Sequence, residues 1–134
     1  MTIYRWTFNT IPNPELVEQF IDAQVPLFSR NNRRITGSDG QPIVDIMKVE
    51  HNCGAFNLEF QFNGIDGQSG DVFCFPGYYP GDLDHQGNPL FNCCDTQGHY
   101  YGKLVSTILE RAQQVFDMEV MTDVTKQRQL YQTV

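Results

Sequence analysis

The stretch Ala55-Phe-Asn-Leu-Glu-Phe-Gln-Phe-Asn63 carries the clearest periodic pattern in the chain. Every second side chain from Phe56 to Phe62 is apolar, and the positions between them are small or polar. Successive side chains of an extended strand point to opposite faces of a sheet. The pattern therefore predicts a strand with one buried face and one solvated face.

Turn-forming residues surround this strand on both sides. Asn52-Cys-Gly54 precedes it, Gly64-Ile-Asp-Gly67 follows it, and Ser38-Asp-Gly40 lies further upstream. Such sequences tolerate positive φ and are typical of hairpin turns. Here they separate four β-rich runs between residues 34 and 75, so this part of the chain is predicted to be an antiparallel meander.

The amino-terminal region predicts another strand and a helix. Aromatic side chains alternate with others along Tyr4-Arg-Trp-Thr-Phe8, which predicts a strand over residues 2–9. Asn13 followed by Pro14 is a favourable helix start. Pro26 is expected to end or kink that helix near Val25.

The carboxy-terminal region predicts a second helix over residues 96–117, because apolar side chains recur there at helical spacing. Leu90-Phe-Asn-Cys-Cys-Asp95 is expected to lead into this helix. The remaining segment, residues 118–134, is compatible with a last strand or with a short helix that Asp123 would cap.

These elements predict an α+β fold in a single domain, residues 1–134. We expect one antiparallel β-meander sheet of four to six strands with two helices packed on one face. The order is compatible with a ferredoxin-like or a cystatin-like layout. A chain of this length can bury enough surface to fold without disulfides or a metal.

Charge is distributed unevenly in this acidic chain, whose formal net charge is −7. Between Ile35 and His99 there are nine acidic residues and one basic residue, Lys48, a net charge of −8. Such a stretch favours solubility, a basic partner or a cation, and it disfavours direct binding to nucleic-acid phosphates. The only basic cluster contains Arg30, Arg33 and Arg34, which could be a solvated helix exit or a site for a phosphate or acidic ligand.

No apolar run approaches the roughly 18 residues that span a bilayer, and the alternating start does not form a secretory signal core. The four cysteines are expected to be reduced, since Cys93 and Cys94 are adjacent and no signal is visible. We therefore expect a cytoplasmic protein that associates with no membrane and uses no cofactor.

Residues 76–97 form a long connection without a regular pattern, and such connections are often functional. Tyrosines on a proline-rich loop lose little entropy on binding, and neighbouring acids add specificity. A second candidate surface is the polar face of the 55–63 strand. The predicted partner-binding residues from these two surfaces are Tyr78, Tyr79, Asp82, Asp84, His85 and Glu59.

Metal and catalytic motifs are incomplete. Asp82-x-Asp84-x-Gln-Gly-Asn88 begins like a calcium loop, but position twelve is Cys93 where a glutamate is required. A zinc site or a cysteine–histidine nucleophile pair would need distant residues to converge, and no local signature supports either. We assign no metal ligand and no catalytic residue, and we leave open whether these six side chains meet: His51, Cys53, Cys74, Cys93, Cys94 and His99.

The leading functional hypothesis is a small acidic interaction protein that binds and blocks a basic protein partner, as an immunity protein or an inhibitor from a phage or mobile element would. The alternative is a small-molecule-binding protein or a small enzyme with a pocket between the sheet and the 76–97 loop. A third class, a subunit of an assembly, would instead expose an apolar patch. The sequence leaves the oligomeric state open.

Overall fold

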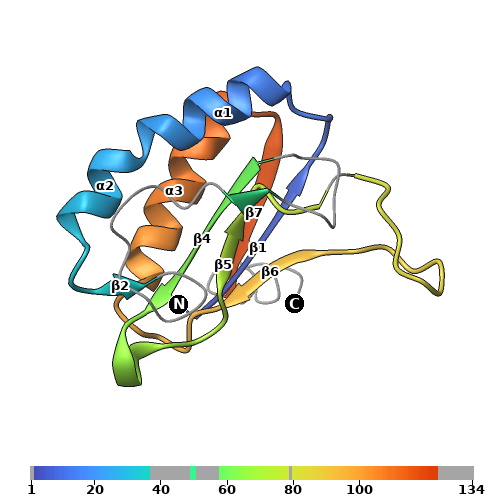
Figure 1. The fold of residues 1–134 in the computed structure, drawn as a ribbon. Helices are drawn as coiled ribbons and strands as arrows, with labels where there is room; N and C mark the ends of the chain where they lie inside the picture. The colour runs from blue at the N-terminus through green and yellow to red at the C-terminus, as the bar shows by residue number, and fades with distance from the viewer. Residues whose placement is uncertain (1, 37–48, 51–57, 79, 124–134) are drawn as a thin grey trace, which may run out of the picture.

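The computed structural model describes residues 2–36, 49–50, 58–78 and 80–123, and within these ranges the chain forms an α+β fold with two antiparallel sheets. The first sheet has the order β6-β1-β7 (Figure 1). Its central strand is β1 (Ile3–Phe8), which pairs with β6 (Asn92–Asp95) on one side and β7 (Met118–Thr122) on the other. The first strand of the chain is thus held by two strands that come much later.

The second sheet is built around β4 (Leu58–Gly64). β5 (Phe73–Phe75) pairs with the middle of β4, while β2 (Ile35–Thr36) and β3 (Val49–Glu50) pair with its two ends. The prediction of one meander sheet is therefore wrong. Alternation identified strands correctly but did not indicate that β1 would recruit β6 and β7 into a separate sheet.

The first predicted helix forms two segments, α1 (Pro14–Ala23) and α2 (Val25–Arg30). The Asn13 Oδ1 atom accepts a hydrogen bond from the backbone N–H of Glu15 at 2.8 Å, which confirms the predicted cap. The helix resumes after Gln24, because Pro26 falls in the first turn of α2, where its missing N–H costs little. α1 ends at Ala23 and α2 starts at Val25, which confirms the predicted end or kink near Val25.

α3 (Gly102–Val115) begins later than predicted, since residues 92–95 form β6 instead of leading directly into a helix. The segment after α3 is strand β7 as far as Thr122. Residues 124–134, where the sequence allowed a short helix, lie outside the described residues. Among the residues described here, no helix is long and apolar enough to span a bilayer.

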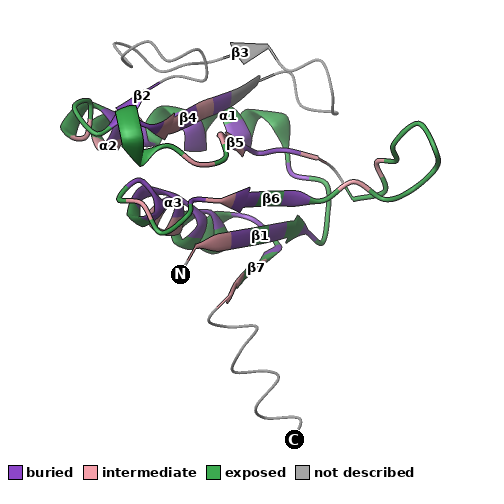
Figure 2. Ribbon diagram, turned by 90° about the horizontal axis from the view of Figure 1, so that it is seen from below, coloured by how far each residue is buried: buried purple, intermediate pink, exposed green. Residues whose placement is uncertain are grey.

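An aromatic core fills the space between the two layers that Figure 2 shows edge-on, with buried segments facing inward. The Trp6 and Phe73 ring centroids lie 5.2 Å apart and link the two sheets, and Phe28 of α2 lies 5.1 Å from Phe60. Phe60 and Phe62 are 1% and 0% exposed. The buried face predicted from the 55–63 pattern is confirmed for these two rings, while residues 55–57 lie outside the described part of the chain.

A short connection between β4 and β5, residues 65–72, is held firmly against the body, and we call it the tethered loop. The Asn63 side chain accepts a hydrogen bond from the Gly70 N–H at 3.0 Å and donates one to the Gly70 carbonyl at 2.9 Å. Asp71 donates its N–H to the Asp95 carbonyl at 2.8 Å, and the Tyr101 hydroxyl donates to the Asp71 carbonyl at 2.7 Å. These bonds join the ends of the two sheets at one corner.

Candidate interaction surface

Residues 76–91 connect β5 to β6 and project from the body as a narrow extension, which we call the arm (Figures 1 and 2). Leu83 and Pro89 form an isolated antiparallel bridge, and the Leu90 N–H donates to the Asp82 carbonyl at 3.0 Å. The outer half of the arm is therefore a small hairpin with its own hydrogen bonds.

The base of the arm is fixed by one buried amide. The Asn92 Oδ1 atom accepts from the Tyr78 N–H at 2.7 Å, and its Nδ2 donates to the Tyr78 carbonyl at 3.3 Å. The Trp6 indole N–H donates to the Pro76 carbonyl at 3.0 Å. Gly77 has φ of +88°, and a Cβ there would lie 2.2 Å from the Asn92 oxygen, so only glycine fits this close approach.

The tip of the arm is organised by Asp84. One carboxylate oxygen accepts hydrogen bonds from the N–H groups of Gln86 at 2.8 Å and Asn88 at 2.9 Å. These bonds favour the charged form and hold the pKa of Asp84 below its ordinary value of 3.8. The carboxylate thus shapes a turn, which explains why the calcium-like spacing of this segment also suits a plain hairpin tip.

The arm exposes apolar side chains that a solvated loop would not need. Phe91 is 75% exposed and Leu83 is 57% exposed. Single exposed apolar residues are common on protein surfaces, but two on one hydrogen-bonded projection are a feature of binding elements. Neither residue carries a sequence pattern that predicts its exposure.

Most of the predicted partner-binding residues lie on the arm. Asp84 and His85 are exposed at its tip, and Tyr78 and Asp82 are partly exposed. Glu59 does not join them, because it lies on β4 opposite Val49, and its side chain is outside the described part of the structure. Tyr79 also lies outside the described residues.

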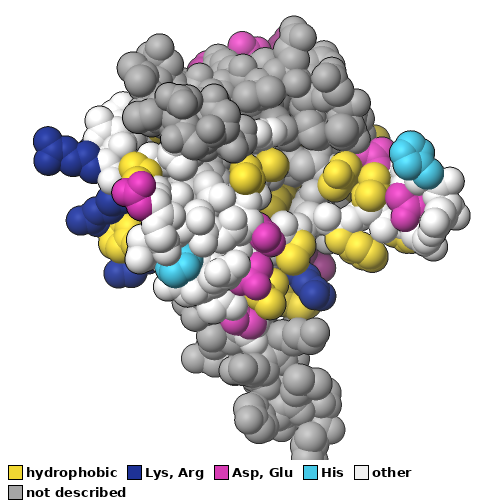
Figure 3. All heavy atoms as spheres, turned by 60° about the horizontal axis from the view of Figure 1, so that its bottom comes forward, with side chains coloured by type: hydrophobic (Ala, Val, Ile, Leu, Met, Phe, Trp, Pro, Cys, Tyr) yellow, Lys and Arg dark blue, Asp and Glu magenta, His cyan; other side chains and the backbone are white. Residues whose placement is uncertain are grey.

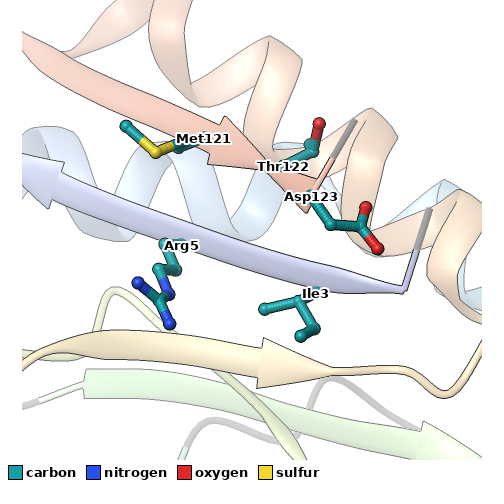
Figure 4. A pocket seen from close by; sticks show the side chains of 5 residues that line it. All are labelled: Ile3, Arg5, Met121, Thr122 and Asp123. Carbon is teal, nitrogen blue, oxygen red and sulfur yellow. The ribbon is translucent and has the colours of Figure 1, made fainter. Parts of the chain in front are cut away.

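The outer face of the β6-β1-β7 sheet lies beside the arm and was missed by sequence reasoning. Ile3, Arg5 and Thr7 alternate with the buried aromatics of β1, and the register places Arg5 between Cys93 and Met121. Figure 4 shows Arg5 and Met121 among the side chains lining a small hollow on this face. The sequence signal for this face is the set of side chains that alternates with the aromatic ones in residues 2–9, namely Ile3, Arg5 and Thr7.

Two hollows on this sheet face are small. They enclose about 60 and about 180 Å³, and Phe91 contributes to the larger one together with Arg5, Met121 and Glu119. Small-molecule sites usually enclose roughly 300 Å³ or more. The face is thus better suited to contacts with side chains of another macromolecule than to holding a metabolite.

The cysteine and histidine candidates do not form a centre in the described ranges. No group of three or more His, Cys, Asp or Glu side chains lies close enough there to hold a metal ion. Cys93 is exposed on the outer sheet face, while its neighbour Cys94 is buried on the inner face. His51 and Cys53 are outside the described residues.

The position of Cys94 differs from the expected lead-in to a helix. It lies in β6, eight residues before α3 begins at Gly102. Burial, followed by the Asp71 carboxylate, raises the pKa of the Cys94 thiol to about 12. The thiol donates weakly to the Asp71 carbonyl at 3.5 Å and packs as part of the core.

Comparisons with protein-family models, curated proteins and solved structures found no match. The functional argument therefore depends on the geometry and charge of the molecule itself.

Proposed function

We propose that this chain is a protein-binding domain that uses the arm to engage a basic surface on a partner protein. The observation that carries the proposal is the exposure of Phe91 and Leu83 on an internally hydrogen-bonded projection that also bears Asp82 and Asp84. Exposed apolar groups supply affinity when a partner buries them, and neighbouring charges speed encounter and select the partner.

Order in the arm supports this role. Hydrogen bonds to Asp84 and Asn92 already fix its turn and its base in the free protein. Docking therefore costs less conformational entropy than it would for a flexible loop. The adjoining outer sheet face, with Arg5 and Met121, extends the contact area beyond the arm itself.

Inhibition is the outcome we infer for the partner. An acidic arm placed on a basic surface would cover the groups that such a surface uses to bind nucleic acid. The chain would then act by occlusion and would need no chemistry of its own.

The test is capture from an extract of the native host, comparing the immobilised chain with matched variants by quantitative mass spectrometry. We expect a basic protein to be retained by the wild type and by Ile11→Ala, which removes a 64% exposed side chain outside the arm. The same protein should be lost with Phe91→Ala and with Asp82→Lys. Equal retention by all four proteins would remove the arm from the proposed function.

Occlusion has a separate readout. Once the partner is identified, its affinity for nucleic acid is measured with and without the chain. We expect the wild type to weaken that affinity and Phe91→Ala to leave it unchanged. Simultaneous binding of chain and nucleic acid would contradict inhibition while leaving partner binding intact.

A further inference from the structure

A second charged surface lies at the other end of the molecule from the arm. It consists of Arg30, Arg33, Arg34 and Lys103 together with Tyr100, and we call it the basic cluster. The Arg34 guanidinium carbon lies 4.1 Å from the centre of the Tyr100 ring, and the Lys103 Nζ atom lies 5.1 Å from the same centre. The exit of α2 and the start of α3 bring these residues together.

Two positively charged groups, those of Arg34 and Lys103, lie beside the one ring of Tyr100. A cation over an aromatic face is stabilised by the ring, but two cations beside one ring also repel each other. An arriving carboxylate would relieve that repulsion. Arg34 and Lys103 are both exposed and Tyr100 is 38% exposed, so the cluster is open to a projecting acidic group.

The arm has the complementary character. It carries Asp82 and Asp84 beside exposed Leu83 and Phe91, which suit the cations and the ring respectively. Figure 3 shows most of the visible Lys and Arg side chains gathered at one end and a projection with acidic and hydrophobic side chains at the opposite end. The α2 exit and the arm likewise lie on opposite sides in Figure 1.

We propose that the arm of one copy docks onto the basic cluster of a second copy, in a head-to-tail contact. This inference rests on the proposed function, since it uses the same arm, and it names a second copy of this chain as a partner.

A head-to-tail contact joins two different surfaces, so a pair of copies still has one free arm and one free cluster. Such contacts propagate into closed rings or open filaments, whereas a symmetric contact stops at a dimer. The exposed apolar side chains of the arm would then be buried between subunits, as expected for a subunit of an assembly.

The experiment is sedimentation velocity on the full chain over a wide range of concentration at low and high salt. We expect the wild type to form oligomers that dissociate in about 1 M salt, because screening shortens the range of the charge contact to roughly 3 Å. Asp82→Lys on the arm, and the pair Arg34→Glu with Lys103→Glu on the cluster, should each weaken self-association about tenfold or more. Gln113→Glu with Gln114→Glu, exposed on α3, is the matched control and should associate as the wild type does.

Mixing the two charge-reversed proteins tests the direction of the contact. The cluster variant keeps a wild-type arm and the arm variant keeps a wild-type cluster, so an equal mixture should recover the association that neither variant shows alone. Circular dichroism confirms that each variant is folded before mixing.

Three outcomes would overturn the inference: a wild type that stays monomeric at every concentration, oligomers that are unaffected by both reversals, or a mixture that recovers no association. A monomeric wild type whose Phe91→Ala variant still loses a basic protein from the host extract would overturn self-docking alone and leave the proposed function standing. A short single-stranded oligonucleotide that binds the cluster of a monomeric wild type would identify the alternative occupant and likewise overturn the proposal.

Discussion

The tethered loop and the arm enter and leave the same short strand, β5, and both are rich in glycine and in Asn or Asp. In the tethered loop these residues bond across to Asn63, Asp95 and Tyr101, so the loop closes against the body. In the outer arm, Asp84 bonds only to the amides of its own turn among the contacts described above. Similar turn residues can therefore fix a connection against the body or leave it projecting, depending on whether their hydrogen-bond partners lie in the body or in the same turn.

Removing the ring at the junction of the two connections should have the largest effect. Phe73 is 0% exposed and its ring centre lies 5.3 Å from that of Phe62 and 5.2 Å from that of Trp6. Phe73→Ala should lower the free energy of unfolding by about 3–5 kcal/mol in urea titrations followed by Trp6 fluorescence. Amides of the tethered loop and of the arm base should both lose protection from hydrogen exchange. A variant that unfolds at the wild-type urea concentration would show that β5 does not hold the two connections together.

Alkaline pH should have the second largest effect on stability, and it should act through Cys94 and Tyr101, which contact the tethered loop. The pKa of Cys94 is raised from 9.0 to about 12, and burial also raises the pKa of Tyr101. A group with a raised pKa in the folded state contributes stability below its unfolded pKa and loses that contribution as pH rises toward the folded value. Stability should therefore decline between pH 9 and about 12, by at most about 1.4 kcal/mol per pH unit for each group.

Cys94→Ser isolates the thiol from this decline. The serine keeps a donor for the Asp71 carbonyl and does not ionise over the same range. Urea midpoints measured across this pH range should fall less steeply in the variant than in the wild type. Identical slopes would mean that Cys94 does not titrate with the unfolding transition.

Removing the Asn63 side chain, which holds the tethered loop, should lower the free energy of unfolding moderately. Asn63→Ala removes three side-chain hydrogen bonds to Gly64 and Gly70, and leaves partly buried backbone groups without those partners. We expect a loss of about 1–3 kcal/mol in urea unfolding. If Asn63→Ala lowers the free energy of unfolding no more than a surface substitution does, the hydrogen bonds of Asn63 do not stabilise the loop.

The equivalent change in the arm should have the smallest effect on the whole molecule. Asp84→Ala should alter the free energy of unfolding by less than about 0.5 kcal/mol, because the residue is exposed and bonds only within its turn. The Gln86 and Asn88 amides should exchange faster, while Asp84→Asn, which keeps an acceptor, should restore part of their protection. A global loss as large as that of Asn63→Ala would erase the distinction between the two connections.

Acid should act on the same turn in the wild type. The pKa of Asp84 is held below 3.8, so its bonds are fully formed above that pH and are lost as pH falls through the lower folded value. The measurement is the protection of the two amides relative to their intrinsic exchange rate at each pH, and lower protection at neutral pH than in acid would contradict this assignment.

The sequence predicted strands where apolar and polar side chains alternate clearly. Tyr4, Trp6 and Phe8 point inward as predicted, as do Phe60 and Phe62. β6 was missed because Asn92-Cys-Cys-Asp95 has little apolar contrast between its two faces. Alternation reports that a face is buried, but it does not report which strand lies alongside, so the division into two sheets could not be predicted.

The candidate site was located only in part for a related reason. The length and irregularity of residues 76–97 indicated a functional segment, and Asp84 and His85 do lie at an exposed tip. Phe91 was read as part of a lead-in to a helix, so its exposure was not anticipated. Whether an apolar side chain faces solvent depends on the path of the backbone in three dimensions, and a single irregular loop carries no period that reveals it.

The central position of β1 has a consequence for how the chain is made. β1 is synthesised first, but Phe8 pairs with Met118, so its neighbour emerges about 110 residues later. At roughly 5–20 residues per second, the ribosome needs on the order of 5–20 s to deliver that neighbour. Trp6 pairs with Asn92, so for about the first 86 residues of this interval the aromatic face of β1 has neither of its partner strands. This makes the nascent strand a natural client for ribosome-associated chaperones.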